Sequence, residues 1–214
     1  MCDALPRSTA SDGRWRMLAL ICAGVVGVLT TWFSATAIMP ELIAAWGLST
    51  SQAAWLTNAV QLGFVAGALA ASVVNLPDAG LLVVTSPTAA ILLRFLTGVA
   101  LAGVYPPALK LMATWFLRGR GLALGFLIGA LTLGSSMPHL LRALTEGIAW
   151  QAVVIGTSLL TLTSAAIFAL LVREGPHAFG RAVFDPRQCL QVFTQRPLWL
   201  ANLGYFGHMW ELYA

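Results

Sequence analysis

Charge is scarce in this sequence. Asp, Glu, Lys and Arg make up only 9% of its 214 residues, whereas hydrophobic residues make up 58%. A soluble domain carries about 25% charged residues, so too few polar side chains are available here to cover a water-soluble enzyme. Cysteine is scarce as well. Cys2, Cys22 and Cys189 lie far apart, which excludes a disulfide framework and a closely spaced metal-binding pair.

Patterns for catalysis and nucleotide binding are also lacking. The glycines fall in helical segments rather than in a strand-turn-helix unit, so the sequence has neither a Walker loop nor a dinucleotide fingerprint. It has no nucleophile constellation and no paired carboxylates either. We therefore expect no enzymatic activity, no cofactor and no metal ion. The net charge of +4 does not indicate a nucleic-acid partner, because the basic residues are dispersed in short breaks between apolar runs.

Long apolar runs are abundant, and the mean hydropathy is +0.81. Runs of about 20 apolar residues predict transmembrane helices, so we expect an all-α, polytopic membrane protein with the lipid bilayer as its surroundings. A cytoplasmic tail at 1–15 leads into a helical bundle at 16–172. A cytoplasmic loop at 173–197 then precedes a further apolar helix at 198–214, which the end of the chain cuts off. Within the bundle the predicted spans are 16–39 (ended by Pro40), 52–74, 88–109, 121–141 and 150–172.

The positions of Lys and Arg conflict with five spans. Arginines at 7, 14 and 16 place the N-terminus in the cytoplasm, since basic residues favour that side. Five spans would then put the basic stretches at 110–120 and 173–196 outside the cell. One more crossing between Asp78 and Pro87 would return both stretches to the cytoplasm, but these residues as a helix reach only about 13 Å of roughly 30 Å of hydrocarbon.

Two interpretations of residues 78–87 follow. In the first, most of a third span and the loop before it are missing from the chain. In the second, a single long helix from 79 to 109 is kinked at Pro87, and the charge bias of the loops is weak. Six of the eight tryptophans lie near the predicted span ends, which supports the other boundaries because indoles prefer the headgroup region.

Three sequence segments resemble the major facilitator superfamily of secondary transporters. Arg94 and Gly98 resemble the arginine-x-x-x-glycine motif of the family's fourth helix. A second segment resembles the family's entry into the fifth helix, with Trp115-Phe116, Arg118, Arg120-Gly121, Ala123 and Gly125. The third, Pro197 to Tyr213, resembles the start of a seventh helix. The order and spacing of these short segments over nearly the whole chain carry the resemblance.

The resemblance implies the N-terminal six-helix half of such a transporter, with the third helix largely missing. Asp78 matches the aspartate of the family's motif between helices two and three, but no arginine follows it. The implied function is gradient-driven, alternating-access transport of a small-molecule solute across the plasma or inner membrane, with protons as the candidate coupling ion. The missing C-terminal half would be the natural packing partner, so we expect this fragment to be inactive. The alternative is a non-transporting membrane interaction protein or a gene remnant.

Arg94 is the strongest candidate for a functional residue. A charge seven residues into a span needs a watery cavity or a partner, and Thr97 and Tyr105 would share its helix face. We interpret Arg94 as a cation that binds an anionic substrate or couples to a carboxylate. The alternative is an arginine whose charge reaches the outer headgroups.

Weaker polar candidates lie on other predicted spans. His208 and Glu211 are i, i+3 neighbours and form a candidate proton site, because burial shifts their pKa values towards each other. A structural hydrogen-bonded pair is the alternative. Asn58 and Gln61 in the second span are further candidates, although buried polar groups often bond only a neighbouring backbone.

Glycines recur every fourth residue on two predicted spans. Such stripes let helix backbones approach closely, so we interpret them as helix-packing surfaces. In the family that the chain resembles, these two helices pack against the other half, which would leave the stripes here without their partners. The two stripes comprise Gly63 and Gly67 on the second span, and Gly121, Gly125 and Gly129 on the fifth.

Overall fold

The computed structural model describes residues 7–70, 86–145, 149–177 and 194–213, and within these ranges it contains helices and turns but no strand. Three helices are long and apolar enough to cross a membrane, at Pro87–Trp115, Arg120–Leu144 and Gln151–Leu170. The prediction of a helical protein with membrane-spanning segments is confirmed to that extent. The chain divides into two compact units, Met1–Ala178 and Phe179–Ala214.

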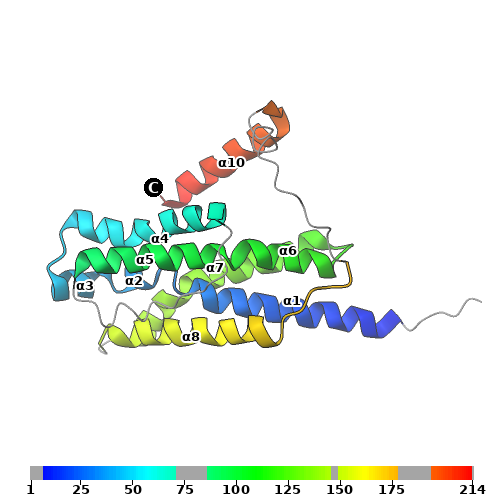
Figure 1. Ribbon diagram of the computed structural model, residues 1–214, viewed down its shortest axis with the longest axis horizontal. Helices are drawn as coiled ribbons and strands as arrows, with labels where there is room; N and C mark the ends of the chain where they lie inside the picture. The colour runs from blue at the N-terminus through cyan, green and yellow to red at the C-terminus, as the bar shows by residue number, and fades with distance from the viewer. Residues whose placement is uncertain (1–6, 71–85, 146–148, 178–193, 214) are drawn as a thin grey trace, which may run out of the picture. The chain divides into compact units, whose positions relative to one another are not determined.

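Long helices lying side by side build the first unit, with two short helices at one end (Figure 1). The long helices are α1 (Arg7–Leu29), α4 (Thr50–Ala70), α5 (Pro87–Ala102), α6 (Tyr105–Trp115), α7 (Arg120–Leu144) and α8 (Gln151–Leu170), and the short ones are α2 (Ser34–Ala37) and α3 (Met39–Trp46). In the second unit the structure describes one helix, α10 (Arg196–Tyr213).

The first predicted span is broken rather than continuous. Helix α1 ends at Leu29, ten residues before the predicted end, and Pro40 lies in the first turn of α3. Proline is tolerated there because the first N–H groups of a helix have no partner within it. The break coincides with Thr30 and Thr31, whose hydroxyls bond the carbonyls of Gly27 (2.6 Å) and Val28 (2.9 Å). Such local bonds compete with the continuing helix, so the prediction that Pro40 ends this span is wrong.

The predicted span at 88–109 is also divided. Helix α5 ends at Ala102, and α6 begins at Tyr105 with a proline in its first turn. At the other end of α5, Ser86 is extended (φ −93°, ψ 125°) and Pro87 begins the helix. A continuous helix from 79 to 109 kinked at Pro87 is therefore wrong. Residues 71–85, which include Asp78, lie outside the described ranges.

Helices α4 and α5 pack in parallel along most of their length. Gly63 faces Phe95, and Gly67 faces Val99, so positions rise together along both helices. The end of α4 and the start of α5 therefore lie at opposite ends of the pair. Whether most of a third span is missing between them stays a prediction.

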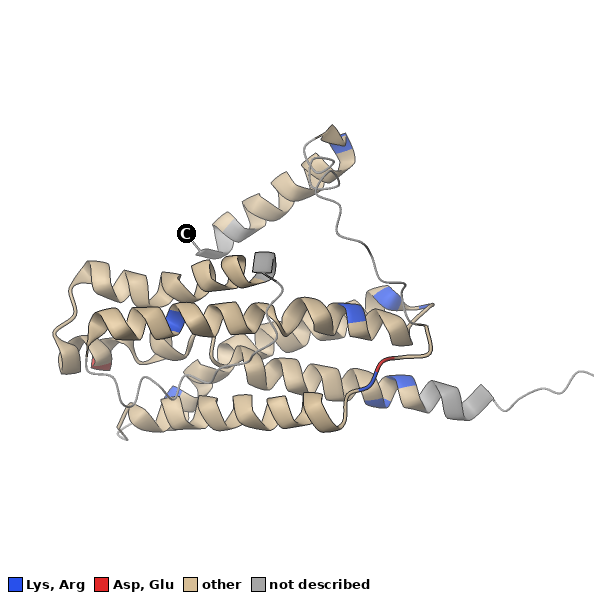
Figure 2. Ribbon diagram, in the orientation of Figure 1, with Lys and Arg blue, Asp and Glu red and all other residues tan. Residues whose placement is uncertain are grey.

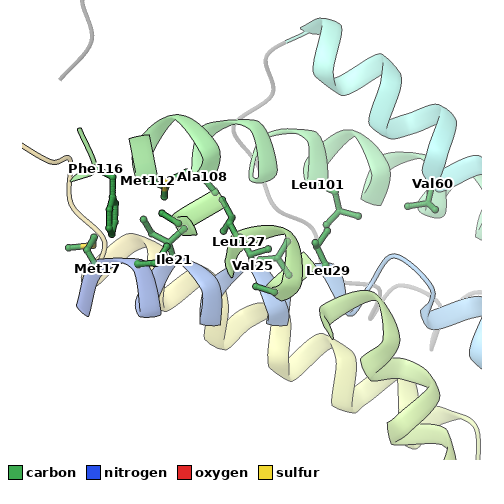
Figure 3. Packing of buried hydrophobic residues seen from close by; sticks show 14 residues of the cluster. Met17, Ile21, Val25, Leu29, Val60, Leu101, Ala108, Met112, Phe116 and Leu127 are labelled. Atoms are coloured by element: carbon green, nitrogen blue, oxygen red, sulfur yellow. The ribbon is translucent and has the colours of Figure 1, made fainter. Parts of the chain in front are cut away.

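Helix α1 is central to the core of the first unit. It packs against α6, α7 and α8, and it contributes apolar residues spaced four apart, Met17, Ile21 and Val25 (Figure 3). This spacing puts them on one helix face. They meet Met112 and Phe116 of α6 and Leu127 of α7, among other residues of the cluster.

Most Lys and Arg residues of the first unit lie at one of its ends (Figure 2). Contacts hold three segments together there. Gly13 faces Trp115, the indole N–H of Trp115 donates to the carbonyl of Arg173 (2.9 Å), and the Nε of Arg120 donates to the carbonyl of Phe116 (2.6 Å). We call this region, formed by residues 13–16, 110–120 and 173–177, the basic end. At the far end Arg142 of α7 pairs with Glu41 of α3.

Candidate functional site

The most distinctive polar site lies where α1 breaks, and Arg94 of α5 occupies it. The Arg94 side chain has no exposed surface. Its Nη2 donates to the carbonyl of Trp32 (2.6 Å), and its Nη1 donates to the carbonyl of Thr31 (2.7 Å). Nη1 also donates to Ser34 Oγ (3.0 Å). A weaker bond runs from Nε to the carbonyl of Leu56 on α4 (3.4 Å).

A guanidinium suits a broken helix for two reasons. The last carbonyls of a helix have no partner within it and carry partial negative charge. The fork of N–H donors on an arginine can meet several of them at once. Arg94 thereby ties α5 and α4 to the segment after α1. In this conformation the carbonyls that it bonds lie around its charge, and the side chain is completely buried.

Hydroxyl groups complete the polar interior on the other side of α1. Thr157 and Thr161 of α8 are buried. Thr161 donates to the carbonyl of Gly27 (3.3 Å), and Thr30 donates to the carbonyl of Thr157 (3.3 Å). Between them Ser158 has a buried Oγ without a hydrogen-bond partner among the described residues. The break is thus joined to α8 as well as to α5.

Of the two residues expected on one face with Arg94, only Thr97 lies on the same helix. Thr97 is buried on α5 and donates to the carbonyl of Leu93 (3.0 Å). Tyr105 begins α6, beyond the turn at 103–104, so a regular spacing from Arg94 no longer applies to it. It is half-buried.

The candidates on α4 lie close in sequence to the Leu56 contact. Asn58 is exposed and Gln61 is half-buried. Between these two positions Ala59 and Val60 are buried, so Asn58 belongs to the opposite, uncovered side of α4. An exposed amide on a helix in a bilayer is costly unless water reaches it.

The predicted proton pair lies on α10, in the second unit. His208 is exposed there, and the side chain of Glu211 lies outside the described side chains. The role of this pair stays a prediction.

The two glycine stripes lie in different surroundings. A Cβ on Gly63 would lie 1.9 Å from the carbonyl oxygen of Phe95, and one on Gly67 would lie 2.4 Å from that of Val99. This stripe is covered by α5 of the same unit, not left for another half. On α7 a Cβ would meet nothing within 4 Å at any position of the second stripe, which comprises Gly121, Gly125 and Gly129.

The second stripe lines an open apolar groove of about 580 Å³ between α7 and α1. Cys22, Ala23 and Val26 form its α1 side, and Phe126 and Leu133 border it on α7. No described group of His, Cys, Asp or Glu side chains is suited to hold a metal ion.

Comparisons with protein-family models, with curated proteins and with solved structures find no match to this chain.

The break after Leu29 and its polar surroundings are a feature that sequence reasoning missed. The signal was present in the sequence as Thr30, Thr31 and Ser34, three hydroxyl residues within an otherwise apolar run. Hydroxyls that bond nearby carbonyls favour helix ends over helix interiors.

Proposed function

We propose that the chain is part of a gradient-driven, alternating-access transporter for a small solute. The observation that carries this proposal is the buried guanidinium of Arg94 bonded to the carbonyls of Thr31 and Trp32. Transporters commonly place substrate and ion sites at interrupted membrane helices, where unwound backbone is tolerated only inside the protein or beside a cavity. A charged residue inside a membrane is a functional candidate for the same reason.

The resemblance of the sequence to the major facilitator superfamily supports the same function. In this proposal the first unit corresponds to the N-terminal six-helix bundle, and residues 71–85 stand where a third crossing would be. The clustering of Arg14, Arg120 and Arg173 at one end supports placing that end in the cytoplasm. The host membrane would be the plasma or inner membrane.

Arg94 would act as a positioning residue in this mechanism. The break divides the first span into α1 on one side and α2 and α3 on the other. Arg94 holds the break to α4 and α5, and the hydroxyls of α8 hold it from the other side. Rocking would then move these helices together around the break while solute enters from one side and leaves on the other. His208 and Glu211 remain the proposed route for a coupling proton.

A substrate is not needed to test alternating access. Asn58 lies on the uncovered side of α4 and would face the central water-filled pathway. In a variant with Cys2, Cys22 and Cys189 replaced by serine, we would introduce Asn58→Cys and label it with a membrane-impermeant maleimide. Right-side-out and inside-out vesicles provide access from each side.

If the chain alternates access although the other half is missing, Asn58→Cys should be labelled from both sides, which would also overturn the expectation that the fragment is inactive. The matched control is Leu159→Cys on α8, a 59% exposed apolar position that would face lipid and stay unlabelled from either side. Labelling of Asn58→Cys from one side only, or from neither, would contradict transport through this face. That result would favour the second candidate, a membrane interaction protein, which the uncovered groove beside α7 also fits.

A further inference from the structure

The basic end carries an excess of positive charge that the proposed transport does not use. Among the described side chains of this region, six are basic and one is acidic. The basic ones are Arg14, Arg16, Lys110, Arg118, Arg120 and Arg173, and the acidic one is Glu174. Four of the six are exposed (Arg16, Lys110, Arg118 and Arg173). Repulsion between so many like charges favours an anionic partner.

Aromatic rings place this charge at the level of a membrane interface. The Trp15 ring packs edge-on against Phe116 (5.4 Å between centroids) and Phe126 (6.4 Å). Trp115 lies beside them and donates to the backbone of Arg173. Tryptophan prefers the headgroup region because one edge of its ring is polar and the body is apolar.

Arg14 has a geometry that suits an anionic group in this position. Its Cζ lies 5.6 Å from the centroid of the Trp15 ring and 5.7 Å from that of Phe116. The rings fix the guanidinium, and they replace part of the water that would otherwise hydrate it. Its Nε is buried and has no hydrogen-bond partner within the described residues. The side chain as a whole is only partly buried, so a phosphate oxygen can approach the rest of the guanidinium, for which it is a strong charge-assisted acceptor.

We propose that the basic end binds the phosphate of an anionic phospholipid headgroup, with Arg14 as the fixed contact and Arg118 as an exposed one. Lipid is favoured over a free anion because the site combines basic side chains with apolar rings at the end of helices that span a bilayer. This inference rests on the membrane placement made in the proposed function, in which the basic end faces the anionic cytoplasmic leaflet.

The test measures binding to the full chain in a neutral detergent, through the change in tryptophan fluorescence. The probes are dioctanoyl phosphatidylglycerol and the zwitterionic dioctanoyl phosphatidylcholine. We expect the anionic lipid to bind at least about 25-fold more tightly, since two basic residues contribute. Each basic residue near a membrane surface is worth about fivefold in affinity, so the double variant Arg14→Gln/Arg118→Gln should lose roughly 25-fold for the anionic lipid and little for the zwitterionic one.

Arg142→Gln is the matched control, because it removes one positive charge at the far end, where Arg142 pairs with Glu41. It should leave the preference for the anionic lipid unchanged. If circular dichroism shows that the double variant misfolds, Arg118→Gln alone replaces it, since Arg118 is exposed, and about fivefold is then expected. Equal binding of both lipids, or an unchanged preference in the folded variant, would overturn the proposal.

Two further arms separate the alternatives. Excess inorganic phosphate should not displace the lipid; displacement would show a free-anion site and overturn the assignment to lipid. The measurement needs no transport, so its failure is distinguishable from a failure of the transporter proposal. Two-sided labelling of Asn58→Cys without lipid preference would refute the headgroup site alone, and lipid preference without two-sided labelling would refute transport alone.

Discussion

Replacing Arg94 tests whether it holds the broken helix together. Arg94→Ala removes two short charged hydrogen bonds, to the carbonyls of Trp32 (2.6 Å) and Thr31 (2.7 Å). Each is worth about 1.5–3 kcal/mol. The carbonyl of Thr31 would keep the hydroxyl of Ser34 as a donor (3.1 Å). The guanidinium would no longer have to be buried, which offsets part of the loss. We expect a net destabilisation of about 3–5 kcal/mol, because two charged hydrogen bonds are lost and the carbonyl of Trp32 loses this donor.

Arg94→Lys should lie between Ala and the wild type. An ammonium can donate to one or two of the same carbonyls, but it lacks the planar fork that reaches acceptors on both sides of the break. About 2 kcal/mol of loss is expected, since roughly half of the charged bonds remain. An arginine that served only by reaching the headgroups would tolerate lysine fully.

The measurement is thermal unfolding of the purified chain in detergent, followed by tryptophan fluorescence. For a domain of this size 1 kcal/mol corresponds to about 2–4 °C, so Arg94→Ala should lower Tm by roughly 10 °C and Arg94→Lys by about 5 °C. The control is Arg173→Ala at an exposed position, for which a change within about 2 °C is expected because surface substitutions have small effects. If the Tm values of Arg94→Ala and Arg94→Lys both matched that of the wild type, Arg94 would not hold the α1 break together.

Three further predictions concern packing, the far end and topology. Gly63→Ala should destabilise the fold by roughly 3 kcal/mol, because the added Cβ meets the backbone of α5. Gly125→Ala on the open side of α7 should be neutral or slightly stabilising. Equal Tm values for the two variants would contradict the packing of α4 on α5. A double-mutant cycle with Glu41→Gln and Arg142→Gln should give a coupling energy of about 1 kcal/mol in unfolding experiments, because both side chains are partly exposed. Additive effects of the two substitutions would show that the pair contributes nothing to stability. A reporter enzyme fused after Arg120 should be active in the cytoplasm, because this residue lies at the same end as the start of α1; a periplasmic signal would exclude the parallel arrangement of α4 and α5 in the membrane.

Sequence periodicity and hydropathy predicted helices well where the helices are regular. The spans at 121–141 and 150–172 match α7 and α8 closely, because their ends are marked by charge or tryptophan. The break after Leu29 and the turn between Ala102 and Tyr105 were missed. Hydropathy averages over a run and does not register two threonines or a glycine within it, although these residues change where backbone carbonyls find their partners.

The candidate site was predicted by residue type but not by geometry. A buried charge was expected to need a partner, and Arg94 has several. The partners are backbone carbonyls of the residues after α1, and no sequence spacing could indicate them because they exist only when that helix ends early. The same limit applies to the glycine stripes. Spacing alone does not distinguish Gly63, which touches another backbone, from Gly125, which touches nothing described.

The parallel packing of α4 on α5 also constrains the order in which the chain can enter a membrane. Two successive helices joined by a tight turn are antiparallel and can be inserted together as a hairpin, but α4 and α5 point the same way. The carbonyl of Phe95 that covers Gly63 is synthesised about 32 residues later. During synthesis the glycine face of α4 is therefore made before the backbone that covers it, and the pair can close only after α5 has been made. A chaperone or insertase that shields this face would act during that interval.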